Sequence, residues 1–168
     1  MTPNTEDVAA KTTETAELGG LIDFDSYLSD KAPTTFRMWG EVWTVRPVGQ
    51  RSVRGSNPGE LGKARAKVVR TQVAANLAKT GLIAAEKSLY ESTDVSQKEL
   101  DEFDSLVDDE QEASDAYTAA VEELATLAVD KPDRFRELAT LNEGLPPGMA
   151  TRILKVVIAG MDATRPFD

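Results

Sequence analysis

The clearest local signal in the sequence is the stretch TFRMWGEVWTVR at residues 35–46. It contains two runs rich in aromatic and β-branched residues on either side of Gly40-Glu41. Glycine at the first of two central positions is typical of a type II′ hairpin turn. Folding about this turn gives the cross-strand pairs Trp39–Val42, Met38–Trp43, Arg37–Thr44 and Phe36–Val45. We therefore predict a β-hairpin over residues 34–47, which Pro47 ends because proline has no backbone donor.

The two faces of this hairpin differ in polarity. One predicted face is wholly apolar and consists of Phe36, Met38, Trp43 and Val45, whereas the other carries Arg37, Thr44 and Arg46. A two-stranded ribbon is only marginally stable alone, so we expect helices or a partner to cover the apolar face. Two interpretations of Trp39 remain open: it shields the turn, or it forms an exposed anchor for a partner together with Val42.

Helical patterns dominate the chain after this hairpin. A basic helix is expected over residues 58–80, starting near Asn57-Pro58 and ending at Gly81, with Leu61, Val68, Val69, Val73 and Leu77 as its apolar set. Acidic helices are expected over 82–129, where Ser96 and Glu99 have the spacing of a capping box. Leu100, Phe103 and Val107 begin an apolar seam, and Tyr117, Val121, Leu124 and Ala128 resume it. Because Glu110 and Ser114 lie between them, the seam indicates either a solvated midsection or a break between two helices.

The C-terminal part completes the expected fold. Helices are expected over 132–160, with Pro132 in a first turn, a turn at Asn142-Glu143-Gly144 and a last helix starting at Pro147. Residues 1–20 contain no aromatic side chain and predict a flexible leader. We therefore expect a mainly α protein: a helical bundle with an N-terminal β-hairpin, forming one domain over 21–168.

Charge is distributed unevenly along the 168 residues, whose net charge is -10. Residues 46–80 carry a net charge of +7 and residues 81–130 a net charge of -13. Either the two blocks fold against each other, or one of them is an interaction surface. Lys63, Lys67 and Arg70 form a basic stripe at helical spacing within the first block.

Composition excludes several kinds of chemistry. The chain has no Cys and no His, which rules out disulfides, thiol nucleophiles and His-dependent triads. The dense carboxylates of residues 101–112 lack the glycine of a Ca²⁺ loop and lie on an expected exposed helix face. The glycine-rich residues 55–63 do not have the spacing of a P-loop. We expect no catalytic, metal or cofactor site, no membrane span, and no general affinity for nucleic acid.

The hairpin together with its flanking residues resembles a known family. A Phe-Asp element at Phe24-Asp25-Ser26-Tyr27-Leu28 precedes the strand pair, and Glu/Asp-rich helices follow it. This arrangement resembles the tail assembly chaperones of long-tailed (siphovirus-type) bacteriophages, especially those of actinobacterial hosts. The resemblance implies that the protein is not an enzyme but a cytoplasmic factor that coats the helical tape measure protein and keeps it soluble during tail assembly.

The expected partner is accordingly the tape measure protein or another phage tail component, and a homo-oligomer is a further possibility. The residues predicted to bind the partner are Trp39, Val42, Lys63, Lys67 and Arg70. The alternative function is a structural virion component, such as a head–tail connector or a head decoration protein. The basic stretch 46–80 departs from the acidic surface that such a chaperone needs.

Overall fold

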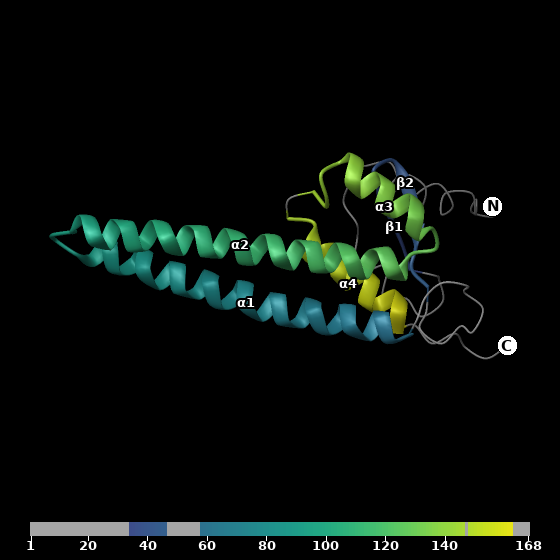
Figure 1. Ribbon diagram of the computed structural model, residues 1–168, viewed down its shortest axis with the longest axis horizontal. Helices are drawn as coiled ribbons and strands as arrows, with labels where there is room; N and C mark the ends of the chain where they lie inside the picture. The colour runs from purple at the N-terminus through teal and green to yellow at the C-terminus, as the bar shows by residue number, and fades with distance from the viewer. Residues whose placement is uncertain (1–33, 47–57, 147, 163–168) are drawn as a thin grey trace, which may run out of the picture.

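The computed structural model describes residues 34–46, 58–146 and 148–162 (Figure 1). The described chain is mainly helical with an N-terminal antiparallel hairpin, which confirms the expected fold class. Its elements are β1 (Thr35–Met38), β2 (Glu41–Thr44), α1 (Pro58–Glu91), α2 (Gln97–Ala128), α3 (Pro132–Leu141) and α4 (Ala150–Asp162). The leader expected at 1–20, the Phe-Asp element, the loop before Pro58 and the helix start expected at Pro147 lie outside the described residues.

The β-hairpin forms where the sequence predicts it, but the turn is one residue earlier than predicted. Trp39 and Gly40 form the turn with φ values of 53° and 76°, and two positive values are characteristic of a type I′ turn. The observed pairs are Thr35–Thr44, Phe36–Trp43, Arg37–Val42 and Met38–Glu41. The predicted type II′ turn and its register are therefore wrong. The predicted apolar face is nevertheless confirmed, because the change of register preserves the alternation of side chains and buries Phe36, Met38, Trp43 and Val45.

Contacts with α3 explain why the turn lies at Trp39 and Gly40. In the αL conformation the indole of Trp39 packs on the ring of Phe135, with 5.1 Å between ring centroids. Glu41, now the first residue of β2, accepts a hydrogen bond of 2.8 Å from Arg134 Nε. These tertiary contacts offset the cost of a positive φ at a non-glycine residue, which the local sequence pattern does not reveal.

Helix α1 is longer than the predicted basic helix. It runs from Pro58 to Glu91 without interruption, so Gly81 lies within the helix and does not end it. Glycine inside a helix costs about 1 kcal/mol relative to alanine. Contacts with α2 along the full length of α1 offset that cost, and the expected boundary at 80–82 is wrong.

Helix α2 is also continuous, from Gln97 to Ala128. The predicted capping box at its start is confirmed: Ser96 Oγ accepts a hydrogen bond from Glu99 N, and the Glu99 carboxylate accepts one from Ser96 N. Glu110 and Ser114 do not break the helix, and both are partly exposed. Of the two alternatives for this region, the structure therefore shows a solvated midsection and not a break between two helices.

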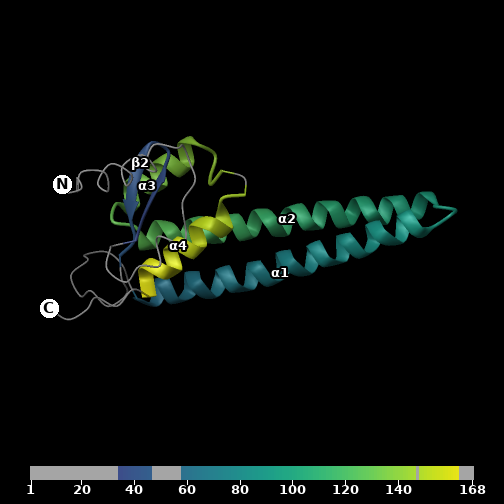
Figure 2. The same ribbon diagram turned by 180° about the vertical axis from the view of Figure 1, so that it is seen from behind.

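The two long helices form an antiparallel hairpin (Figure 2). Their facing residues are spaced alternately three and four apart, as in a coiled coil. On α1 these residues are Ala64, Val68, Thr71, Ala75, Ala78, Leu82, Ala85 and Leu89; on α2 they are Phe103, Leu106, Glu110, Ala113, Tyr117, Ala120 and Leu124. Residues 69–116 are all described, and none of them is fully buried. We call this part of the hairpin the arm.

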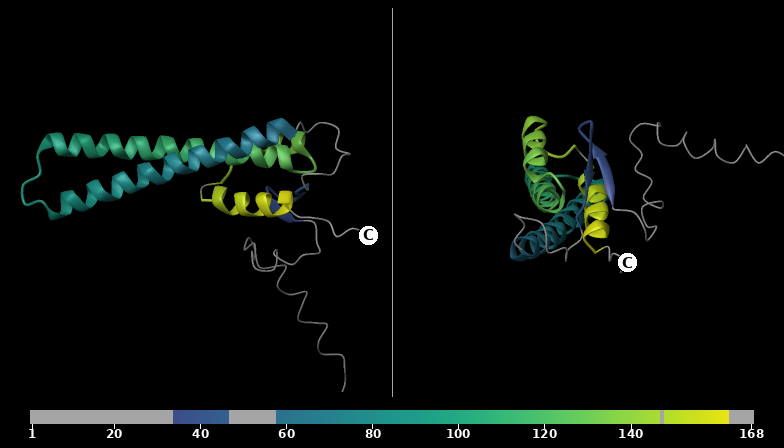
Figure 3. Two further views of the ribbon diagram at one scale, coloured as in Figure 1. Left: turned by 90° about the horizontal axis from the view of Figure 1, so that it is seen from below. Right: turned by 90° about the vertical axis from the view of Figure 1, so that its right-hand side faces the viewer.

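The hydrophobic core lies at the other end of the hairpin, which we call the base. Here β1, β2, α3 and α4 pack around the last turns of α2 (Figures 1 and 3). Phe135 of α3 is at its centre, with its ring edge-on to Trp43 at 5.0 Å and to Phe36 at 6.4 Å. Leu124 and Ile153 are fully buried beside these rings. Aromatic packing of this kind supplies much of the stability of a small core.

The free edge of β2 is covered by the end of α2. Val45 forms an isolated antiparallel bridge with Val129, and Asp130 N donates to Thr44 O at 2.9 Å. Arg46 donates through Nε and Nη2 to the carbonyl oxygen of Val129. The hairpin is thereby fixed to the C-terminal end of α2, and the arm extends away from this attachment.

Candidate functional site

Trp39 and Val42 do not form one anchor in this structure. Trp39 is half-buried against Phe135, and its indole nitrogen is buried with no hydrogen-bond partner among the described residues. Val42 is exposed and pairs with Arg37 on the hairpin face opposite to Trp43. The interpretation in which Trp39 shields the turn fits these positions. Val42 remains as a single exposed valine, and isolated exposed apolar residues are common on protein surfaces.

The predicted basic stripe lies on the part of α1 beside the base. Lys63, Lys67 and Arg70 are all exposed, and Lys67 donates a hydrogen bond to the Glu123 carboxylate of α2. This is the ion pair that joins the basic and acidic blocks within the described chain. Although α1 and α2 pack side by side, Lys63 and Arg70 have no ion-pair partner among the described residues. The blocks are adjacent, but most of their charges face solvent.

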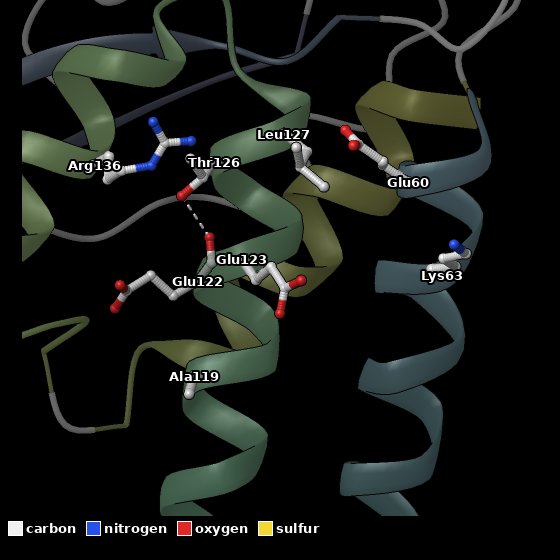
Figure 4. A pocket seen from close by; sticks show the side chains of 8 residues that line it. All are labelled: Glu60, Lys63, Ala119, Glu122, Glu123, Thr126, Leu127 and Arg136. Carbon is white, nitrogen blue, oxygen red and sulfur yellow. Dashed lines mark hydrogen bonds between the residues drawn. The ribbon is translucent and has the colours of Figure 1, made fainter. Parts of the chain in front are cut away.

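A shallow groove lies between α1, α2 and α3 (Figure 4). Its volume is about 440 Å³, and its lining consists of Glu60, Lys63, Ala119, Glu122, Glu123, Thr126, Leu127 and Arg136. The hydroxyl of Thr126 donates to the backbone oxygen of Glu122, so this hydroxyl is already engaged. The lining mixes three carboxylates with two cations, and such a mixture does not select an anion or a cation. No group of three acidic side chains within 34–46, 58–146 and 148–162 is arranged to hold a metal ion.

The exposed apolar side chains of α2 in the arm lie on the same helix face as buried side chains at the base. The stripe that the sequence predicts as a seam has two parts in the structure. Near the base, Val121 and Ala128 are buried, whereas in the arm Val107 and Leu100 are 40% and 42% exposed. We call Leu100 and Val107 the distal stripe.

The position of α4 explains this change in exposure. The hairpin has two sides, and an ion pair marks each of them. Arg65 forms an ion pair with Asp162 of α4 on one side, and Lys67 forms one with Glu123 on the other. On the α4 side, α4 starts level with Tyr117, whose hydroxyl is 3.5 Å from Thr151 Oγ1. Figure 3 shows that α4 lies beside the base and does not extend along the arm. The distal stripe therefore continues the α4-binding surface of α2 beyond the end of α4.

Carboxylates surround the distal stripe. Between Gln97 and Asp115, α2 carries nine acidic residues and a single lysine, Lys98. All of these carboxylates except that of Glu110 belong to exposed residues. The arm thus combines an apolar line with a strongly negative surface, which favours a partner with positive charge.

A second exposed apolar set lies on α1, among the apolar residues predicted for the basic helix. Val68 is buried and Leu61 is partly buried, but the other members of the predicted set are exposed. We call these residues and two further exposed ones the outer stripe: Val69, Val73, Leu77, Ile83 and Tyr90. The spacing of the residues separates the buried members of the predicted apolar set from the exposed ones. Leu61 and Val68 are seven residues apart on one face, whereas Val69, Val73 and Leu77 follow at intervals of four on another.

Comparison of the chain with protein-family models, curated proteins and solved structures gives no match. The described helices include none with both the length and the apolar character needed to cross a membrane.

Proposed function

We propose that the chain is a non-enzymatic assembly chaperone that holds a helical segment of another protein against its arm. In this proposal it acts in the cytoplasm of a host cell, and its partner is the tape measure protein of a long-tailed bacteriophage. The partner's identity comes from the resemblance of residues 24–45 and of the acidic helices to tail assembly chaperones. The exposed apolar side chains of the arm support the choice of binding surface.

The observation that carries the proposal is that the distal stripe lies on the same face of α2 as the α4-binding surface. Val121 of α2 is fully buried at the base, where α4 packs, and Val107 and Leu100 lie on the same face beyond Ser114, where they are 40% and 42% exposed. A partner helix lying in line with α4 would extend an existing helix–helix contact. Recognition of an amphipathic helix by an apolar groove commonly uses anchors at this spacing.

Charge specifies the kind of helix that fits. The carboxylates around the distal stripe include Asp104 and Asp108, which are exposed and have no ion-pair partner among the described residues. A helix with one apolar face and flanking Lys or Arg side chains would place its charges opposite them. Exposed ion pairs contribute little affinity, so the charges set orientation and association rate, while the apolar contacts supply binding energy.

Co-expression with a tape measure protein tests this proposal. The tape measure protein encoded beside this chain's gene should be recovered in the soluble fraction with the wild-type chain and should precipitate without it. Leu100→Asp combined with Val107→Asp should abolish the rescue, because two charges would then occupy the apolar line. A matched control is Ser105→Asp with Ala116→Asp, which adds the same charges at exposed positions of α2 off the stripe.

Far-UV circular dichroism establishes that each variant keeps its helices, since all four positions are at least partly exposed in the wild type. If the stripe variant keeps the tape measure protein soluble as well as the control variant does, the proposed surface is contradicted. A tape measure protein that is soluble on its own would contradict the chaperone function. Recovery of the chain in stoichiometric amount from purified particles would support the alternative, a structural virion component.

A further inference from the structure

The outer stripe of α1 belongs to a second series of positions with coiled-coil spacing. The series faces away from α2 and alternates steps of three and four residues: Ala66, Val69, Val73, Asn76, Thr80, Ile83, Lys87 and Tyr90. Leu77 lies beside it. Its large apolar members are more than half exposed, from Val73 at 53% to Tyr90 at 82%. Because α2 already covers the opposite face of α1, this series is left uncovered by the described chain.

The series is self-complementary when it is reversed. If α1 is laid antiparallel on a second α1 with the two-fold axis at residue 78, Val73 meets Ile83 and Ala66 meets Tyr90. At the centre, Asn76 meets Thr80 of the second copy, and these are the two uncharged polar members. The Thr80 hydroxyl donates to Asn76 O in its own helix, which leaves its lone pairs available to the Asn76 amide across the interface. A polar pair inside an otherwise apolar seam fixes the register of coiled coils.

Charges beside the series point to the same orientation. Lys63, Arg65 and Arg70 flank its start, and Glu86 and Glu91 flank its end. Antiparallel pairing brings Glu86 to the level of Arg70 of the second copy, and Glu91 to the level of Arg65, with Lys63 two residues away. Parallel pairing would instead place like charges opposite each other. The antiparallel arrangement brings like charges together at two levels: the two Lys79 side chains near the axis, and Lys87, which meets Val69, beside Arg70 of the second copy.

The shape of the molecule also favours the antiparallel arrangement. The base widens one end of the hairpin, while α1 runs along an edge of the molecule, with α2 between it and α3 (Figure 1). Two copies in antiparallel orientation place their bases at opposite ends of the pair. Such an interface is isologous, the commonest kind in soluble dimers.

We propose that two copies of this chain pair antiparallel through the outer stripe of α1. The pairing uses a different face from the distal stripe, so it leaves the proposed partner surface open. The two arms then lie side by side in opposite directions between the two bases, and each dimer presents two distal stripes.

Sedimentation equilibrium tests the pairing on the full chain. The wild type should be a dimer, and Val73→Asp with Leu77→Asp should raise the dimer dissociation constant by at least about tenfold, as expected for charges in an interface centre. The control Ala74→Asp with Ser88→Asp adds the same charges at exposed positions of α1 off the series and should leave the dimer intact. Lys79→Ala should tighten the dimer, because it removes the like-charge contact near the axis. A monomeric wild type, or a dimer indifferent to the stripe variant, would overturn the proposal.

Cysteine cross-linking tests the orientation, and the absence of native cysteine makes the result unambiguous. Leu77→Cys lies near the axis and should form a disulfide between copies under mild oxidation. Val69→Cys should not, because antiparallel pairing separates the two sites by about 27 Å along the axis, far beyond the Cα distance of a disulfide. A mixture of Val69→Cys and Lys87→Cys chains should cross-link. Self-cross-linking of Val69→Cys would show parallel pairing and overturn the proposed arrangement.

Discussion

Gly160 of α4 lies directly against Val45, the residue that follows β2. A Cβ placed on residue 160 would be 2.5 Å from Val45 Cβ and 3.0 Å from Thr34 Cβ. The absence of a side chain at this one position allows α4 to approach the hairpin closely. The contact joins two segments that are more than a hundred residues apart and closes the base on the side of α4.

Gly160→Ala should therefore destabilise the fold. Alanine is normally the better helix former by about 1 kcal/mol, but the overlap with Val45 should outweigh this and give a net loss of about 1–3 kcal/mol. Gly81→Ala is the matched control, because residue 81 is also inside a helix and a Cβ there meets nothing within 4 Å. We expect Gly81→Ala to stabilise by about 1 kcal/mol. Urea denaturation of both variants measures the difference, and equal effects would contradict the close approach of α4.

Trp43 should be among the most costly residues to truncate. It is fully buried, its ring packs on Phe135, and its Nε1 donates to Met38 O at 3.1 Å. Trp43→Ala should reduce the free energy of unfolding by about 3–5 kcal/mol. Val42→Ala, one residue away on the exposed face, should cost less than about 1 kcal/mol. Thermal melts followed at 222 nm compare them, and a larger loss for Val42→Ala would mean that the faces of the hairpin are reversed.

The faces of the hairpin could be predicted because they depend only on alternation. Phe36, Met38, Trp43 and Val45 stay on one side for either position of the turn. The position of the turn depends on Phe135 and Arg134, which lie about a hundred residues further along the chain. Local sequence carries no information about such contacts, so the register could not be predicted from residues 35–46 alone.

Helix boundaries show the same division between local and tertiary causes. The capping box at Ser96 and the proline at the start of α3 are local signals, and both mark real helix starts. Gly81 is a local stop signal that α2 overrides by packing along the whole of α1. The candidate surfaces are the hardest part to predict from the sequence. The exposure of Val107 depends on where α4 ends, and the exposure of Val73 depends on which face of α1 is covered by α2.

The ion pair between Lys67 and Glu123 should contribute little to stability. Its side chains are 55% and 48% exposed, and pairs in this range are worth about 0–1 kcal/mol. Lys67→Ala should therefore lower the free energy of unfolding by less than about 1 kcal/mol. The thermal midpoint of the wild type should be nearly unchanged between low salt and about 0.5 M salt, because the exposed pair that salt screens contributes so little stability. A large fall in the midpoint with salt would show that the +7 and -13 blocks interact more extensively than this single pair.

The tip of the arm should respond to acid through Glu99. Hydrogen bonds from the backbone and then the hydroxyl of Ser96 lower the pKa of Glu99 below its ordinary value of 4.5. Since the folded-state pKa is the lower one, the stabilisation is present above pH 4.5 and is lost as the pH falls through the folded-state value. Ser96→Ala removes the N-cap acceptor, should cost the helix start about 1 kcal/mol, and should return the pKa of Glu99 toward 4.5. Carbon-detected NMR titration of the Glu99 carboxyl measures this change. An unaltered Glu99 titration in Ser96→Ala would mean that the Ser96 hydroxyl does not bond the Glu99 carboxylate in solution.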